Sequence, residues 1–188
     1  MKFALALTLG VLGGCADTRS SAPIENDGAP CHVAAQYIDL LLTKEQGRAV
    51  FVETPETMPL TVKGLQWNAR NGAVFQTVPG DELLAKLSAT EGTSVVKTCA
   101  NIRSLLARKH VGYGHEAVEE AKKIGDNGAF IATVFGTSLP VMSTNGREAL
   151  FLSSGVGAPE GGGGFVHYYR LSATNKWEEV SWAGLWIA

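Results

Sequence analysis

The sequence lacks most of the features that mark familiar functional classes. The chain has three cysteines among 188 residues, and its 16 scattered basic side chains are outnumbered by 18 acidic ones. Strong nucleic-acid binders usually carry a clustered basic patch. Apart from the N-terminal segment there is no long apolar run of the kind that a membrane-spanning helix needs. We therefore expect neither a nucleic-acid partner nor a multi-span membrane protein.

Specific catalytic and cofactor motifs are also missing. The glycine-rich stretch 155–164 lacks the Gly-Lys-Ser/Thr ending of a phosphate-binding loop, and no serine lies in the Gly-x-Ser-x-Gly pattern of a nucleophile elbow. Cys31, His32 and Cys99 do not complete a zinc-binding spacing. The sequence predicts no cofactor and no metal.

The N-terminus, by contrast, has a recognisable pattern. Lys2 supplies a positive charge, Phe3 to Leu12 form a short apolar run, and two small residues precede Cys15. This order is typical of a cleavable export signal, and the run is shorter than the roughly 20 residues that span a bilayer. Residues 1–14 are therefore predicted to be a signal peptide.

The segment Leu12-Gly13-Gly14-Cys15 resembles the lipobox of bacterial lipoproteins. In that family the signal is cut before the cysteine, and the cysteine thiol carries a diacylglycerol. The resemblance implies a mature chain that begins at a lipidated Cys15. Ala16 is not the aspartate associated with inner-membrane retention, which implies an outer-membrane location facing the periplasm. An ordinary export signal with an unmodified Cys15 is the alternative, and both alternatives imply export.

The rest of the chain divides into a tether and one domain. Residues 16–30 are short-sided and polar, with Ile24 as their one large apolar residue, so a flexible tether is predicted from the lipidated Cys15 to residue 30. Residues 31–188 suit a single globular domain. In an oxidising compartment Cys31 and Cys99 could form a disulfide. Two buried thiols are the alternative.

The hydrophobic periodicity of this domain predicts an α+β fold. Apolar residues recur at helical spacing after Pro30, after Asp81, after Ser94 and from His115 to Lys123. Alternating patterns predict strands at 48–54, 60–78, 130–135, 140–143, 148–154, 165–171 and 177–187. We expect helices packed on a mainly antiparallel sheet that ends in a C-terminal β-meander.

Turn signals complete the fold prediction. Asn71-Gly72 and Asn145-Gly146 predict hairpin turns. The glycine-rich stretch is predicted to be a loop, and because glycine lacks a β-carbon its backbone could approach a ligand closely. A mobile hairpin loop without a ligand is the alternative. The candidate binding-loop residues are Gly155, Gly157, Glu160, Gly161, Gly162, Gly163 and Gly164.

Two weak candidate sites involve histidine. Ser153 and Ser154 precede the glycine-rich stretch and His167 follows it, so hairpin pairing could bring a hydroxyl near an imidazole. A turn near Pro159, however, puts Ser153 opposite Phe165 instead of His167, and no acidic residue is obviously placed to orient the histidine. We therefore predict no catalytic residue. The second candidate is a metal site at His115 and Glu119, which share a helix face at i, i+4 spacing but supply too few ligands.

Aromatic residues gather near the C-terminus and are a candidate binding surface. Trp177, Trp182 and Trp186 would bind partners if exposed together and would fill the core otherwise. The first hypothesis is a noncatalytic, lipid-anchored envelope protein that binds an envelope protein or a cell-wall component. The alternative is an envelope hydrolase that uses His167 with Ser153 or Ser154, or a metal near His115.

Overall fold

A computed structural model describes residues 27–45, 48–53, 75–89 and 93–187. The predicted signal peptide, Cys15, most of the predicted tether and the turn predicted at Asn71-Gly72 lie outside these ranges. The described residues form the expected α+β fold, with five helices and a mixed seven-stranded sheet. None of these helices is both long enough and apolar enough to cross a membrane.

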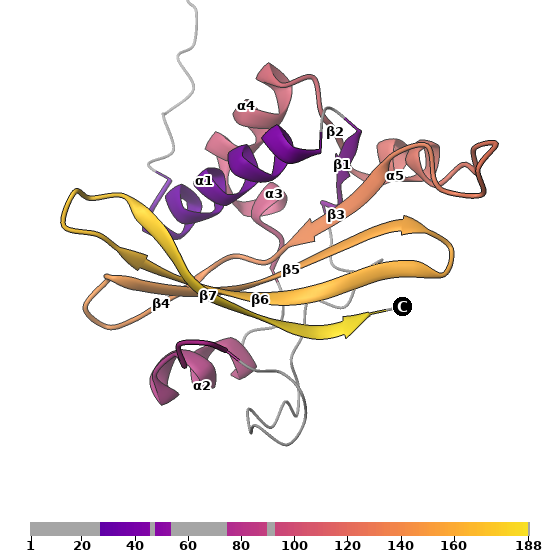
Figure 1. Cartoon of the computed structure of the whole chain (residues 1–188). Helices are drawn as coiled ribbons and strands as arrows, with labels where there is room; N and C mark the ends of the chain where they lie inside the picture. Colours follow the sequence, from indigo (N-terminus) through magenta and orange to yellow (C-terminus); the bar gives the residue numbers. More distant parts are fainter. Residues whose placement is uncertain (1–26, 46–47, 54–74, 90–92, 188) are drawn as a thin grey trace, which may run out of the picture.

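The sheet has the strand order β2-β1-β3-β5-β6-β7, and β4 pairs with β5. β1 pairs in parallel with β2 and β3, whereas the other pairs are antiparallel. The three long C-terminal strands form the expected meander, which is the broad middle layer of the molecule between α1 and α2 (Figure 1). The bounds are β1 (Ala49–Phe51), β2 (Gly112–Tyr113), β3 (Thr133–Thr137), β4 (Val141–Met142), β5 (Glu148–Ala158), β6 (Gly161–Leu171) and β7 (Trp177–Ile187).

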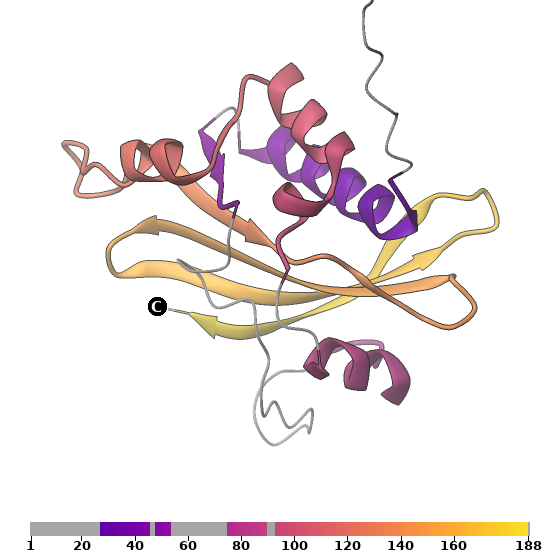
Figure 2. The same cartoon turned by 180° about the vertical axis from the view of Figure 1, so that it is seen from behind.

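Helices cover both faces of the sheet. α1 (Ala29–Lys44), α3 (Val95–Thr98) and α4 (Ala100–Arg108) lie on one face, and α2 (Asp81–Ala89) lies on the other, as the view from behind also shows (Figure 2). α5 (His115–Ala121) packs beside β1 and β3. Side chains of β5 alternate between the two faces: Ala149 and Phe151 pack with α1, and Leu150 and Leu152 pack with α2.

The helix predicted after Ser94 is two helices in the structure. Cys99 has extended backbone angles (φ −102°, ψ 115°), so α3 ends and α4 begins at this residue. The Asp27 carboxylate accepts hydrogen bonds from the backbone N–H groups of Ala100 and Asn101 and satisfies the start of α4. Since α1 begins at Ala29, the folded domain includes residues that were predicted to belong to the tether.

A disulfide between Cys31 and Cys99 joins α1 to the start of α4, with the two Cα atoms 5.6 Å apart. Both cysteines lie in the core cluster that α1, α3 and α4 form with the sheet, and Cys99 is fully buried. The bond therefore cross-links two helices that are far apart in the sequence and share one face of the sheet.

The glycine-rich stretch is strand and not loop, so the loop prediction is wrong. β5 continues to Ala158 and β6 begins at Gly161, with pairs such as Gly155 opposite Gly163. A Cβ on Gly155 would lie 2.9 Å from the Phe135 ring of the neighbouring strand, so glycine leaves room for this ring over β5. The glycine content suggested a loop because the sequence does not show this close packing.

Candidate functional site

A chain of hydrogen bonds crosses the three meander strands on the face that α1 covers. Ser153 Oγ on β5 lies 2.7 Å from His167 Nε2 on β6, and His167 Nδ1 lies 2.6 Å from Glu179 Oε1 on β7. Ser153 and His167 are buried, with 5 % and 9 % of their surface exposed. The order hydroxyl, imidazole, carboxylate is the arrangement that activates a nucleophile in many hydrolases.

The register of the hairpin is as predicted, but the expectation that it keeps the Ser153 hydroxyl away from the His167 imidazole is wrong. Phe151 lies opposite His167, and Ser153 lies opposite Phe165. The hydroxyl and the imidazole meet nevertheless, because diagonal neighbours on one sheet face are within reach of a long side chain. Ser154, the other serine considered, pairs with Gly164. Because side chains alternate along a strand, Ser154 faces the opposite side of the sheet from Ser153.

A β-bulge brings both Glu179 and Trp182 beside His167. Tyr169 pairs with Glu179, Tyr168 pairs with Ser181, and His167 pairs with Trp182, so one extra residue of β7 lies between the first two pairs. In a regular strand positions 179 and 182 would face opposite sides of the sheet. The bulge re-aims the strand, which is a common role of bulges next to functional sites.

Tyr37 of α1 extends the chain of hydrogen-bonding side chains from the helix that covers this face of the sheet. Its ring centroid lies 4.7 Å from that of His167, and its hydroxyl interacts with Ser153. An ionised carboxylate can only accept, so the Nδ1–H of His167 donates to Glu179, and in the neutral imidazole Nε2 then accepts from the Ser153 hydroxyl. The chain therefore has a direction, from the serine hydroxyl through the imidazole to the carboxylate.

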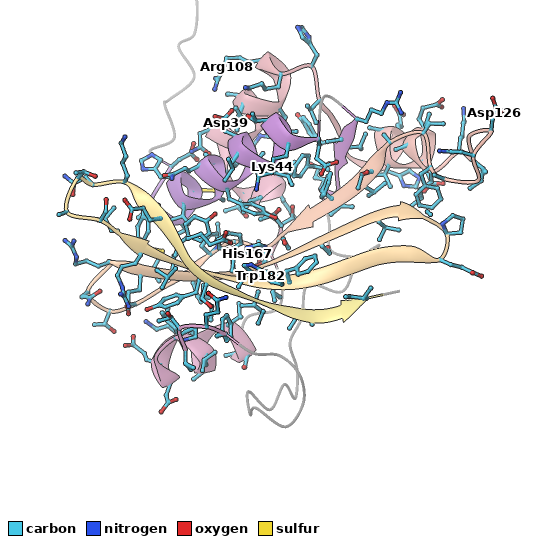
Figure 3. All side chains as sticks on the ribbon, viewed as in Figure 1. Asp39, Lys44, Arg108, Asp126, His167 and Trp182 are labelled. Carbon is cyan, nitrogen blue, oxygen red and sulfur yellow. A yellow bond between two sulfur atoms is a disulfide. The ribbon has the colours of Figure 1, made fainter. Side chains whose placement is uncertain are left out.

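A pocket of about 360 Å³ opens beside this chain, between α1, β6 and β7. We call it the α1 pocket. Leu40 and Trp182 are 49 % and 55 % exposed at this site, and the Phe165 and Trp182 rings meet edge to face with centroids 5.7 Å apart. Figure 3 shows His167 and Trp182 close together below α1. The pocket is lined by Tyr37, Leu40, Leu41, Lys44, Phe165, His167, Tyr169, Glu179 and Trp182.

Burial of the phenol raises the pKa of Tyr37 from the ordinary 10.0 to about 12. The Ser153 hydrogen bond acts in the opposite direction, and the Glu179 carboxylate adds to the rise. Tyr37 is therefore a protonated hydroxyl throughout the physiological pH range.

Wild-type protein is expected to lose stability more steeply than Tyr37→Phe when the pH rises above 10. Between the unfolded pKa near 10 and the folded pKa of about 12, the folded state holds the phenol proton that the unfolded state has released, so stability falls as pH rises. Once the pH exceeds both pKa values, wild-type protein should have lost roughly 3 kcal/mol more stability than the variant. Urea unfolding of both proteins at about pH 9 and about pH 11.5 measures most of this extra loss. Parallel loss of stability in the two proteins would show that Tyr37 is not buried.

The metal candidate is not assembled in the structure. His115 is the first residue of α5, and Glu119 lies 3.6 Å from the Lys122 ammonium in an ion pair. Within the described ranges, no group of three or more histidine, cysteine, aspartate or glutamate side chains could hold a metal ion.

The other sequence candidates are separate from the α1 pocket. Trp177 is buried in the cluster of α1 and the meander, so it does not join Trp182 in an exposed aromatic surface. Glu160 lies in the turn between β5 and β6, at the far end of these strands from Trp177. None of the glycine-stretch residues lines the pocket.

Sequence reasoning missed Tyr37 and Glu179. Glu179 carried a usable signal, because the short loop between residues 171 and 177 sets the β6–β7 register and places it opposite Tyr169. Tyr37 carried none, since its position depends on how α1 packs on the sheet. Comparisons with protein-family models, curated proteins and solved structures found no match. The function is therefore inferred from the geometry of the α1 pocket.

Proposed function

We propose that the protein is a lipid-anchored protein of the bacterial cell envelope whose folded domain binds a small ligand in the α1 pocket. The resemblance of Leu12 to Cys15 to a lipobox supports the anchor, and Ala16 supports an outer-membrane location facing the periplasm. The Cys31–Cys99 disulfide supports an oxidising compartment.

The make-up of the α1 pocket carries the proposal of ligand binding. Small-molecule sites are typically concave and largely apolar, with a few converging polar groups that orient the ligand. Leucine and aromatic side chains supply the apolar part of this pocket, and Tyr37, His167 and Glu179 supply polar groups. Leu40 and Trp182 would lose contact with water on binding, which favours a ligand with an apolar body.

A positive charge at the pocket suggests the chemistry of the polar end of the ligand. Lys44, the last residue of α1, is exposed and lines the pocket, so its ammonium can meet an acidic group. The volume of about 360 Å³ suits a small molecule or one compact group of a cell-wall component. We therefore propose a ligand with a ring or short chain as its body and an acidic or polar end.

We expect 4-(trifluoromethyl)benzoate, which has both features, to bind the full chain in neutral detergent with a Kd on the order of 1 mM. Fluorine NMR line broadening measures this binding, with empty micelles as the blank. Trp182→Ala is expected to weaken binding about fivefold, because the probe ring loses its aromatic contact.

Ile187→Ala is the matched control for this experiment. Ile187 lies on the same strand and is 85 % exposed, but it is not among the residues that line the pocket. Its replacement should leave probe binding unchanged. Equal weakening in both variants, or no binding by the wild-type protein, would contradict the proposed site.

A further inference from the structure

We propose that Ser153 is a nucleophile that cleaves short-chain carboxylic esters, with His167 as its base, Glu179 as the positioning residue of the base and Tyr37 as the donor to the oxyanion. This inference rests on the proposed function, because the ester must first occupy the α1 pocket. It adds a chemical step that ligand binding does not require.

The hydrogen-bond chain supplies the base and its orientation. Because Nδ1 of His167 donates to Glu179, the lone pair on Nε2 faces the Ser153 hydroxyl at 2.7 Å. Serine hydrolases on unrelated folds share one arrangement. It consists of a nucleophile, a base within hydrogen-bond reach and a third group that orients the base. The ring of His167 is also held between Tyr37 and Phe151, with centroid distances of 4.7 and 5.2 Å.

Tyr37 is placed to stabilise the oxyanion. β5 lies between β3 and β6, so its backbone N–H groups belong to the sheet ladders and a side-chain donor is needed. Tyr37 interacts with Ser153 and its ring contacts that of His167, so its hydroxyl lies near the atom at which a tetrahedral carbon would form. A tyrosine hydroxyl is an established type of oxyanion donor.

Burial of Ser153 limits the substrates. Ser153 has 5 % of its surface exposed and is not among the residues that line the α1 pocket, but its hydroxyl contacts His167, which does line it. The space at the hydroxyl is therefore small, whereas the pocket of about 360 Å³ has room for a ring. The geometry therefore favours esters with a small acyl group, such as acetyl, and an apolar or aromatic alcohol that stays in the pocket.

The reaction proceeds through two balanced half-reactions. Ser153 Oγ forms a bond to the acyl carbon while its proton passes to His167 Nε2, and the carbonyl electron pair moves to the oxygen that Tyr37 contacts. The C–O bond to the alcohol then breaks, and the alcohol oxygen takes the proton from His167. Water repeats these steps on the acyl-serine, which releases the carboxylic acid and restores the hydroxyl.

The test is labelling of the full chain in neutral detergent by a small alkyl fluorophosphonate, which forms a serine O–P bond and releases fluoride. We expect one label at Ser153, located by peptide mass spectrometry, and turnover of 4-nitrophenyl acetate. Ser153→Ala should abolish both. Ser154→Ala is the matched control, and it should keep both because Ser154 faces the other side of the sheet.

Two conservative variants separate catalysis from folding. Glu179→Gln should lower kcat at least about 100-fold with little change in KM, because the wrong histidine tautomer is then favoured. Tyr37→Phe should lower kcat by roughly 100-fold or more. A folded wild-type protein that binds 4-(trifluoromethyl)benzoate but takes no label at Ser153 would overturn this inference and leave the proposed binding function intact. Absence of both would overturn both.

Discussion

Replacing Cys31 and Cys99 together with alanine is expected to lower the free energy of unfolding by about 4 kcal/mol. The disulfide closes a loop with a sequence separation of 68, and the chain-entropy model assigns on the order of 4 kcal/mol to a loop of this length. The bond also joins α1 to α4, and α1 is the helix that carries Tyr37 into the α1 pocket. Urea unfolding of wild type and variant at one pH measures the difference.

The single variant Cys99→Ala is the control for the disulfide prediction. It breaks the same bond, so its loss of stability should be close to that of the double variant. Two free thiols in folded wild-type protein, measured by thiol titration under non-reducing conditions, would contradict the disulfide. A double variant within about 1 kcal/mol of wild type would contradict its expected contribution.

Cys15→Ala is expected to abolish acylation completely and to change the location of the protein without unfolding the domain. The proposed anchor is a single modified thiol, and the first residue of the described fold, Asp27, comes well after Cys15. Intact-mass spectrometry of the purified chain detects the lipid, and membrane fractionation of the cells follows the location.

Cys31→Ala is the matched control for the lipid anchor, because it removes a different cysteine. The lipid mass should persist in this variant, although stability falls with the disulfide. An unmodified Cys15 in wild-type protein, or a retained signal peptide, would contradict the anchor. Neither result would bear on the α1 pocket, since none of the residues that line it precedes Tyr37.

The sequence predicted the α+β class and the meander because both depend on local patterns. Alternation marked β7, helical spacing marked α1, and the turn near Pro159 set the correct β5–β6 register. The division between α3 and α4 was missed, because the carboxylate that accepts from the first N–H groups of α4 belongs to Asp27, which comes from a distant part of the chain. The glycine-rich strands were missed because Gly155 is explained by contact with Phe135 on another strand.

The candidate site was half visible in the sequence. Ser153 and His167 were recognised as neighbours in a hairpin, but only directly opposite pairs were considered, and the two residues meet diagonally. The bulge that turns Trp182 to the same side as Glu179 has no local signature, because residues 177–187 read as one regular strand. The position of Tyr37 could not be predicted, because it depends on how α1, which is remote in the sequence, packs on the sheet.

The most direct test of the account is nitrogen NMR of full-length protein labelled only at histidine, before and after addition of 4-(trifluoromethyl)benzoate. Four histidines contribute to the spectrum, and substitution of His167 by glutamine assigns its signals. We predict that His167 carries its proton on Nδ1, with Nε2 unprotonated, and that its signals shift on probe addition while those of His32, His110 and His115 do not. A proton on Nε2, or a His167 signal that the bound probe leaves unchanged, would contradict the proposed site.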